Sequence, residues 1–191
     1  MSHPSRHHDP EPGFASLYES LYPDLLRFVQ RRAHRDHAED VVADTFLVVW
    51  RRFDELPRER DDQRGWAFGI ARNMLLNDQR GTERRRALGV RLADASALRW
   101  GPSPADPDAD LVVGRIDLAR AWECLSPVHQ EALALTVFED MGAPQAAAVL
   151  DISPVAFRLR LSRARRALRL HLDRLSPSDT SSVAPERTLQ P

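Results

Sequence analysis

Apolar residues recur at spacings of three and four along most of the chain, which is the period of an amphipathic α-helix. The clearest case runs from His37 to Phe53, and its apolar positions are Ala38, Val41, Val42, Thr45, Phe46, Val49, Trp50 and Phe53. We expect all of these positions to line one core face. Similar patterns predict helices on either side, one in two stretches interrupted near Pro23 and one from about Gly65 to Arg80. No segment alternates apolar and polar residues as a half-buried strand does, so the pattern predicts an all-α fold.

Two Ser-Pro pairs divide the carboxy-terminal half into shorter helices. Ser126-Pro127 and Ser153-Pro154 each place a capping residue before a proline that can occupy the first helical turn. Between them, we expect Gly142 to end one helix and Pro144 to open a short one, about Gln145 to Leu150. A short helix, a tight turn and a longer capped helix form the helix-turn-helix plan, whose second helix lies in the major groove of DNA.

Proline and acidic residues separate two helical blocks. The stretch 90–113 contains three prolines and four aspartates against two arginines, and it has no helical period. We predict that it is a flexible acidic linker between two small helical domains, residues 14–89 and 114–175. The terminal segments 1–13 and 176–191 are polar and contain several prolines, so we expect both to be disordered tails.

Charge is distributed unevenly although it nearly cancels overall. The chain has 27 basic and 28 acidic residues for a net charge of −1, and every basic residue is arginine. The segment 154–174 holds seven arginines against one aspartate, so the rest of the chain is acidic. A basic stripe on an acidic molecule fits a protein that contacts phosphate with one surface and another partner elsewhere. The alternative is a solvated helix face that happens to be rich in arginine.

Several function classes lack their usual signals. Apolar runs such as Phe46–Trp50 are five residues long, far short of the ~18 that a membrane-spanning helix needs, and residues 1–13 do not resemble a signal peptide. We expect no membrane insertion and a cytoplasmic location. There is no glycine-rich phosphate loop and no nucleophile elbow, so we expect neither an enzyme nor a small-molecule substrate. His34, His37 and Asp40 could be drawn as metal ligands, but they stand at a helix start among charged residues, and we expect no metal and no cofactor.

Three segments of the second block resemble a known family. They are Leu161–Leu168, Leu125–Glu131 and the turn Ala147–Ser153. Together they are similar to the carboxy-terminal promoter-binding domain of the extracytoplasmic-function (ECF) sigma factors, which are small two-domain bacterial initiation factors. The resemblance covers about residues 14–175. It implies that the chain binds core RNA polymerase, directs promoter recognition, DNA melting and transcription initiation, and is controlled by an anti-sigma factor.

The first block agrees with this resemblance. Its segments Ala38–Phe46 and Trp50–Phe53 resemble the helix by which these factors bind the polymerase clamp, and Trp66–Asn73 resembles the segment that melts the promoter and reads its minus-ten element. The implied polymerase-binding residues are Asp40, Asp44, Arg51 and Arg52. The implied minus-ten residues are Asn73, Asn77, Arg80, Arg84 and Arg85. An asparagine amide carries donors and an acceptor, so it can bind the edge of an unstacked base, but the alternative for each set is an ordinary solvated helix face.

In the second block, the resemblance implies contacts to the minus-thirty-five element. The implied residues are Arg158, Arg160, Arg163, Arg165 and Arg166. Arg158 and Arg160 come early in the recognition helix, where a bidentate base contact would be worth ~1–3 kcal/mol of discrimination. We expect the other three to hold phosphate.

The chain departs from the usual family pattern at three places around this helix. Asp151 stands in the turn where a small residue is usual, and Phe157 stands where valine is common. Ala146–Ala148 replaces the more common acidic and β-branched run. These changes affect which minus-thirty-five sequence the chain would recognise.

Two other classes of protein could use part of this sequence. A stand-alone helix-turn-helix repressor would share the second block, dimerise and protect a footprint on duplex DNA without polymerase. That class of protein does not explain the function of the first block. A purely structural helical adaptor would not predict a basic recognition helix behind a Ser-Pro cap.

Overall fold

The computed structural model describes residues 10–33, 35–78, 89–91 and 109–175. All regular secondary structure in these ranges is helical, which confirms the all-α prediction. The elements are α1 (Pro10–Gln30), α2 (Arg35–Arg51), the 3-10 turn η1 (Phe53–Glu55), α3 (Arg60–Asp78), α4 (Ala109–Glu123), α5 (Pro127–Val137), α6 (Ala143–Leu150) and α7 (Pro154–Leu175). Most of the expected tails and of the expected linker lies outside the described residues, but residues 10–13 of the expected amino-terminal tail form the first turn of α1, which corrects that part of the prediction.

The first helical block consists of α1, α2 and α3. Its core contains Val42 and Val49 of α2 and Phe68 of α3, and the Phe28 ring of α1 meets the Phe68 ring edge-on with 4.9 Å between centroids. The expectation for Trp50 is wrong, because its side chain is 41% exposed at the rim of this core.

Helix α1 is continuous through Pro23, which corrects the expectation of two separate stretches. Proline removes one backbone hydrogen bond and crowds the preceding turn. Leu21 and Leu25 on either side are buried in the core, so tertiary packing holds the helix together across this defect.

The second helical block consists of α4 to α7. Trp122 of α4, Leu133 of α5 and Ala164 of α7 share a buried cluster with Val90, a residue that the sequence pattern assigned to the linker. Helix α4 begins at Ala109, earlier than the expected Gly114. The expected linker therefore contributes both a core residue and a helical turn at its two ends.

The expected serine caps lie at the amino-terminal ends of α5 and α7, and only one of them forms a hydrogen bond. The Ser153 hydroxyl accepts a hydrogen bond from the Ala156 amide at 3.2 Å, which confirms the cap of α7. Ser126 occupies the corresponding position before α5, but its hydroxyl makes no capping hydrogen bond.

Helix α5 ends at Val137 and not at Gly142, because the chain turns into the left-handed conformation at Asp140, with φ of 49°. Gly142 instead precedes α6.

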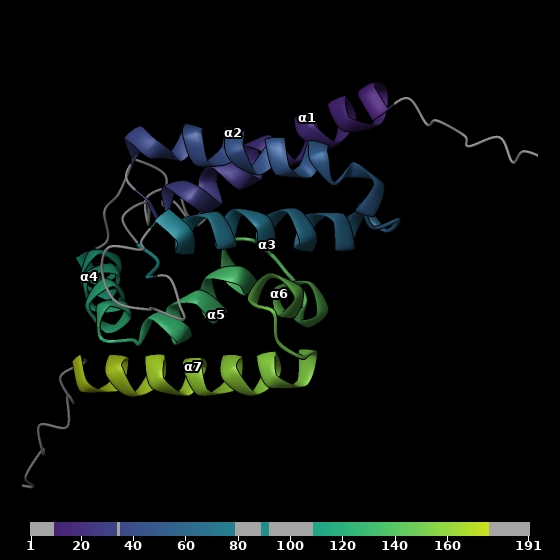
Figure 1. Cartoon of the computed structure of the whole chain (residues 1–191). Helices are drawn as coiled ribbons and strands as arrows, with labels where there is room; N and C mark the ends of the chain where they lie inside the picture. The colour runs from purple at the N-terminus through teal and green to yellow at the C-terminus, as the bar shows by residue number, and fades with distance from the viewer. Residues whose placement is uncertain (1–9, 34, 79–88, 92–108, 176–191) are drawn as a thin grey trace, which may run out of the picture.

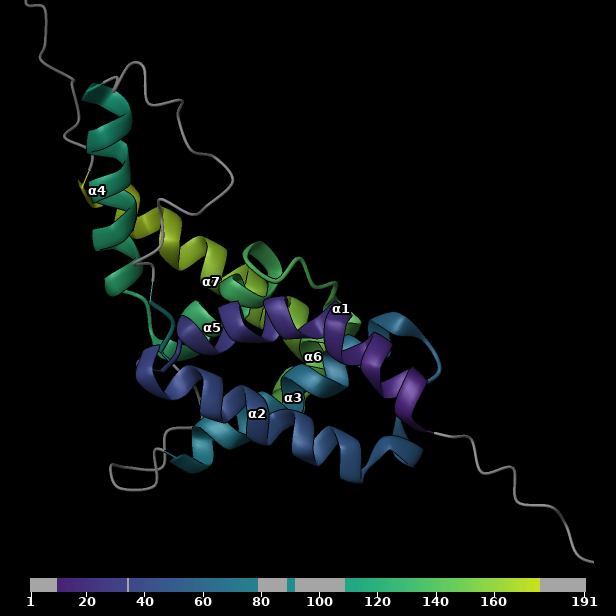
Figure 2. The ribbon, with the colours of Figure 1, turned by 90° about the horizontal axis from the view of Figure 1, so that it is seen from above.

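The two blocks pack directly on each other. Figure 1 shows α3 lying between the α1–α2 pair and helices α5 and α6, with α7 on the far side of α5 and α6. Figure 2 shows α4 at one end of the molecule, beside the end of α7. One buried cluster includes Phe68 of α3, Leu135 of α5, Val149 of α6 and Phe157 of α7. The hydrophobic core therefore runs through both blocks.

Candidate nucleic-acid interface

Helices α6 and α7 form the expected helix-turn-helix. The turn depends on Asp151, whose backbone lies in the left-handed region with φ of 53° and ψ of 50°. The Ile152 amide donates to the Ala147 carbonyl at 3.0 Å, so the last carbonyls of α6 are satisfied within the turn. A small residue is favoured at such a position because glycine has no Cβ to clash, and aspartate is one of the few side chains that tolerate it. The departure at Asp151 is therefore compatible with the motif.

The other two departures meet in one buried cluster, which contains Phe157 and two of the three alanines. Phe157 is buried at the start of α7, in the same cluster as Ala146 and Ala147 of α6. A larger side chain on one helix fits where the facing helix carries methyl groups, since protein cores conserve total volume. Burial of Phe157 and Ala164 fixes which face of α7 points away from the core.

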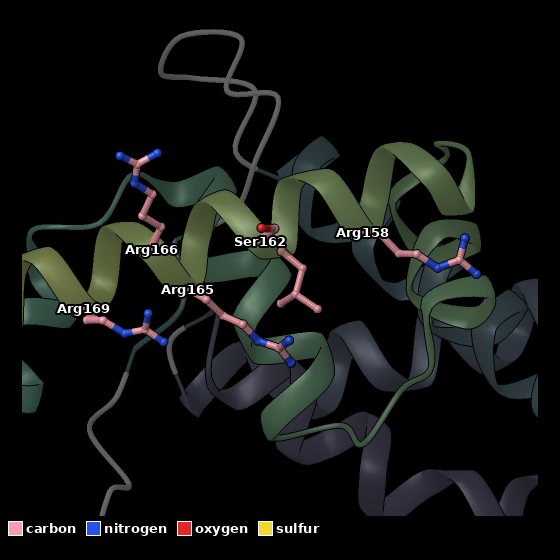
Figure 3. Close-up of a pocket in the computed structure, with 6 residues that line it drawn as sticks. Arg158, Ser162, Arg165, Arg166 and Arg169 are labelled. Atoms are coloured by element: carbon pink, nitrogen blue, oxygen red, sulfur yellow. The ribbon is translucent and has the colours of Figure 1, made fainter.

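The outer face of α7 carries a row of arginines along an open groove of about 500 Å³. The lining residues are Arg158, Leu161, Ser162, Arg165, Arg166 and Arg169. In Figure 3, the guanidinium groups of Arg158, Arg165 and Arg169 extend to the same side of the helix, and Arg166 extends to the other. The lining contains no carboxylate, so the groove has the charge and the helical geometry to hold a polyanion.

The structure divides the arginines that the sequence grouped together. Arg158, Arg165 and Arg166 line this groove, whereas Arg160 is half-buried and Arg163 is exposed outside it. Arg169 also lines the groove, and the site prediction missed it. Its spacing of four residues from Arg165 was the available signal, because residues four apart share one helix face.

The two candidate minus-ten asparagines lie at the carboxy-terminal half of α3. Both side chains are exposed, and Asn73 lines a cavity of about 570 Å³ between α3 and α6 together with Gln145 and Asp151. Trp66 is partly buried against the core and lines the same cavity, with the Arg52 guanidinium 5.5 Å from its ring centroid. Arg80, Arg84 and Arg85 lie outside the described residues.

The candidate polymerase-binding residues lie on α2. Asp40, Asp44 and Arg51 are exposed, and with the exposed Leu47 they follow the spacing of a single helix face. Arg52 is turned toward Glu55, with its Nε 3.1 Å from Oε1, and this hydrogen bond lowers the pKa of the Glu55 carboxyl. The exposed face thus combines carboxylates with an apolar residue, a combination that suits a basic protein surface.

Other classes of site receive no support in the described part of the chain. No group of three or more His, Cys, Asp and Glu side chains there is arranged to hold a metal ion. None of the helices in the described ranges is long and apolar enough to cross a membrane.

Comparison with known proteins agrees with this geometry. Residues 17–85 match the family Sigma-70 region 2, and residues 115–168 match Sigma-70, region 4. The ECF RNA polymerase sigma factor SigL of Mycobacterium tuberculosis is 30% identical over 167 residues, which cover 84% of this chain and 92% of SigL. The sigma factor CnrH of Cupriavidus metallidurans is 33% identical over 140 residues, covering 71% and 73% of the two chains.

A solved structure shares the fold. It is the sigma factor RpoE of Bartonella quintana, solved in complex with the anti-sigma factor NepR, with a TM-score of 0.57 and 23% identity over 84% of this chain and 97% of that chain.

Two helical blocks, the second with a basic helix-turn-helix, define a DNA-binding transcription factor. The two matched regions show that the chain belongs to the sigma-70 family, and its relatives place it among the ECF RNA polymerase sigma factors. It binds core RNA polymerase and directs promoter recognition, DNA melting and transcription initiation.

Proposed function

We propose that the arginine groove of α7 binds the minus-thirty-five element. The observation that carries this proposal is a row of exposed arginines whose lining contains no carboxylate, on the second helix of a helix-turn-helix. Arg158 is closest to the start of α7, which is the part of a recognition helix that reaches base edges. Arg165, Arg166 and Arg169 follow along the helix and contact phosphate, and Arg160 and Arg163 contact DNA from the other flank.

Residues 14–89 act as the region-two domain and 114–175 as the region-four domain. In the first, Asn73 and Asn77 bind unstacked bases of the minus-ten element, and the cost of extruding a base is a few kcal/mol that such contacts must offset. Arg80, Arg84 and Arg85 follow in sequence and contact phosphate. The exposed α2 face with Asp40, Asp44 and Arg51 binds core polymerase, assisted by Arg52.

The cellular location of the factor follows from its binding partners. The factor works in the cytoplasm, where polymerase and promoters are, and it catalyses no reaction of its own. The complex of the Bartonella relative with an anti-sigma factor supports control of this chain by a partner of the same kind.

The test is run-off transcription with purified core polymerase across a promoter library. We expect a defined minus-ten and minus-thirty-five pair to be selected only when the full chain is present. Asn73→Ala with Asn77→Ala should abolish opening but retain polymerase binding, and Glu19→Gln, an exposed change on α1, serves as the control. A specific footprint on duplex DNA without polymerase, together with dimerisation, would instead support the repressor.

A further inference from the structure

Two apolar side chains are exposed near the start of α7. Val155 is 70% exposed, the highest fraction of any large apolar side chain in the described part of the chain, and Leu159 is 52% exposed. The two positions are four residues apart, so their side chains lie on one helix face, one turn from each other. Single exposed apolar residues are common on protein surfaces, but this pair occupies the part of a recognition helix that enters the major groove.

Both side chains point away from the core of the protein. The buried residues Phe157 and Ala164 mark the inner face of α7. At 3.6 residues per turn, Val155 and Leu159 are each about 160° around the helix axis from Phe157. They therefore lie on the outermost line of the helix, which continues through the exposed Arg166.

Arginines flank this outermost line on both sides. Arg158, Arg165 and Arg169 extend to one side of the helix, as Figure 3 shows. The exposed Arg163 lies on the other side, about 120° around the axis from Phe157 in the opposite direction. The apolar pair therefore lies between positive charges.

This arrangement matches the cross-section of the major groove of DNA. The groove is about 12 Å wide and has a phosphate backbone on each side, and an α-helix with its side chains is about 10–12 Å across. A helix with arginines on both flanks can bind both backbones at once, because arginine pairs well with phosphate. The line between the flanks then faces the base edges on the floor of the groove, and Val155 and Leu159 are on that line.

The chemistry of valine and leucine favours one kind of base edge. Neither side chain has a hydrogen-bonding group, and all four bases present donors or acceptors in the major groove, to which thymine adds an apolar C5-methyl group. An apolar side chain that covers a polar edge removes its water without replacing the hydrogen bond, which is unfavourable. An apolar side chain that covers the methyl group buries apolar surface, which is favourable.

We propose that Val155 and Leu159 determine the specificity of the minus-thirty-five contact by packing against thymine methyl groups in the major groove. The two side chains are about 6 Å apart along the helix axis, or roughly two base-pair steps of ~3.4 Å. The recognised element therefore contains two thymines, on either strand, within about three base pairs. This inference rests on the proposed binding of that element by α7, and it adds the base that the apolar residues select.

A DNA ligand fits this surface better than a protein ligand does. The groove beside the pair is lined by four arginines and contains no carboxylate, so its charge matches a polyanion. Two exposed apolar side chains are also few for a stable protein interface, which buries about 1,200–2,000 Å². Contact of the pair with a protein partner is the alternative that variants of the two residues distinguish.

Uracil substitution in the promoter tests the proposal with the unmodified protein. Holoenzyme, formed from purified core polymerase and the full chain, first selects a minus-thirty-five element from a promoter library. Each thymine of that element is then replaced by uracil, which pairs like thymine but lacks the C5-methyl group. At two thymines, we expect the affinity of the holoenzyme to fall about fourfold, which corresponds to ~0.8 kcal/mol for one buried methylene-sized group. Uracil in place of thymines upstream of the element should have no effect.

Alanine variants then assign each thymine to a side chain. Val155→Ala and Leu159→Ala remove apolar atoms at exposed positions where alanine favours the helix, so the circular dichroism should be unchanged. In each variant, uracil at one of the two thymines should no longer reduce affinity, because the methyl group has already lost its partner. Leu170→Ala is the matched control. It truncates a 49% exposed apolar residue about three turns further along the same helix, and it should keep both uracil effects.

The outcomes separate the role of the apolar pair from the proposed function. A selected element without thymine, or the absence of any uracil effect within it, would overturn the assignment of thymine to this pair. Uracil effects that persist in both alanine variants would also overturn it, and the pair would then be left for a protein partner. If the holoenzyme selects no minus-thirty-five sequence at all, the proposed function of α7 fails before any thymine is replaced.

Discussion

Two arginine-rich surfaces of this molecule differ in how their charges are matched. On the surface between the blocks, Arg72 and Arg32 are buried against Glu131 and Glu139. On the outer face of α7, arginines line an open groove without a carboxylate. Buried arginines with partners hold protein parts in one arrangement, whereas exposed arginines without partners are available to a ligand. The same residue type therefore serves cohesion on one surface and recognition on the other.

The largest effect on stability should come from removing the carboxylate of Glu131 from its buried ion pair with Arg72. Glu131→Leu leaves Arg72 buried without its carboxylate, which costs about 3–5 kcal/mol. We expect the variant to keep its helical circular dichroism but to unfold at a lower urea concentration. The free energy of unfolding from urea titrations should fall by a similar amount, about 3–5 kcal/mol.

A compensating change checks the reason for this effect. Adding Arg72→Met to Glu131→Leu replaces the ion pair by apolar side chains, so the free energy of unfolding should recover to near the original level. A free energy of unfolding that stays low in the double variant would show that Glu131 acts by something other than its pairing with Arg72.

Substitutions in the arginine groove of α7 should change promoter binding and leave the free energy of unfolding unchanged. Arg158→Ala should reduce discrimination for the minus-thirty-five element by ~1–3 kcal/mol in competition binding with holoenzyme. Arg160→Ala should also weaken promoter selection, but less, because Arg160 is half-buried and lies outside the groove. Polymerase affinity should be unchanged for both. Loss of promoter and polymerase binding to the same degree would contradict the separation of roles.

The caps of the second block offer a smaller, paired test. Ser153→Ala removes a hydroxyl that accepts the Ala156 amide, so the free energy of unfolding should fall by about 1 kcal/mol in urea titrations. Ser126→Ala removes a hydroxyl without a capping hydrogen bond, and its effect should stay within about 0.5 kcal/mol. Equal losses at the two serines would contradict the difference between the two helix starts.

The exposed carboxylates of α2 should show the smallest effect. Asp40→Asn and Asp44→Asn should each weaken polymerase binding by about 0.5–1 kcal/mol at low salt, and less at high salt, because exposed charges are screened. Fluorescence anisotropy at two salt concentrations measures this, with Glu19→Gln as the control. An effect that is independent of salt would argue against an electrostatic role.

The sequence pattern predicted the local structure well where the signal was local. The helix-turn-helix and the Ser153 cap are confirmed, because caps, turns and periodicity depend on residues within a few positions of each other. The pattern failed where packing overrides local preference. Pro23 lies inside a continuous helix, and Trp50 is at the rim of the core although it shares the period of buried residues.

The candidate site shows the same division. The sequence placed Arg158, Arg165 and Arg169 on the same helix, but the site prediction left out Arg169, which also lines the groove. The number of arginines in the segment could not show that Arg160 lies outside the groove, because it does not tell which face of the helix is covered by the rest of the protein. Position 90 was assigned to the linker for its surroundings in sequence, whereas its burial comes from Trp122 and Leu133.

The sequence by itself determined the helices, the capped recognition helix and the excess of arginine along it, because each arises from residues adjacent or one turn apart. Only the tertiary structure decided that Arg72 meets Glu131, 59 residues away, and that Arg31 meets Glu139, 108 residues away. Such pairings depend on how whole helices pack, and a helical period states which face is apolar without stating what covers it. The relation between the two blocks is therefore a property of the folded chain.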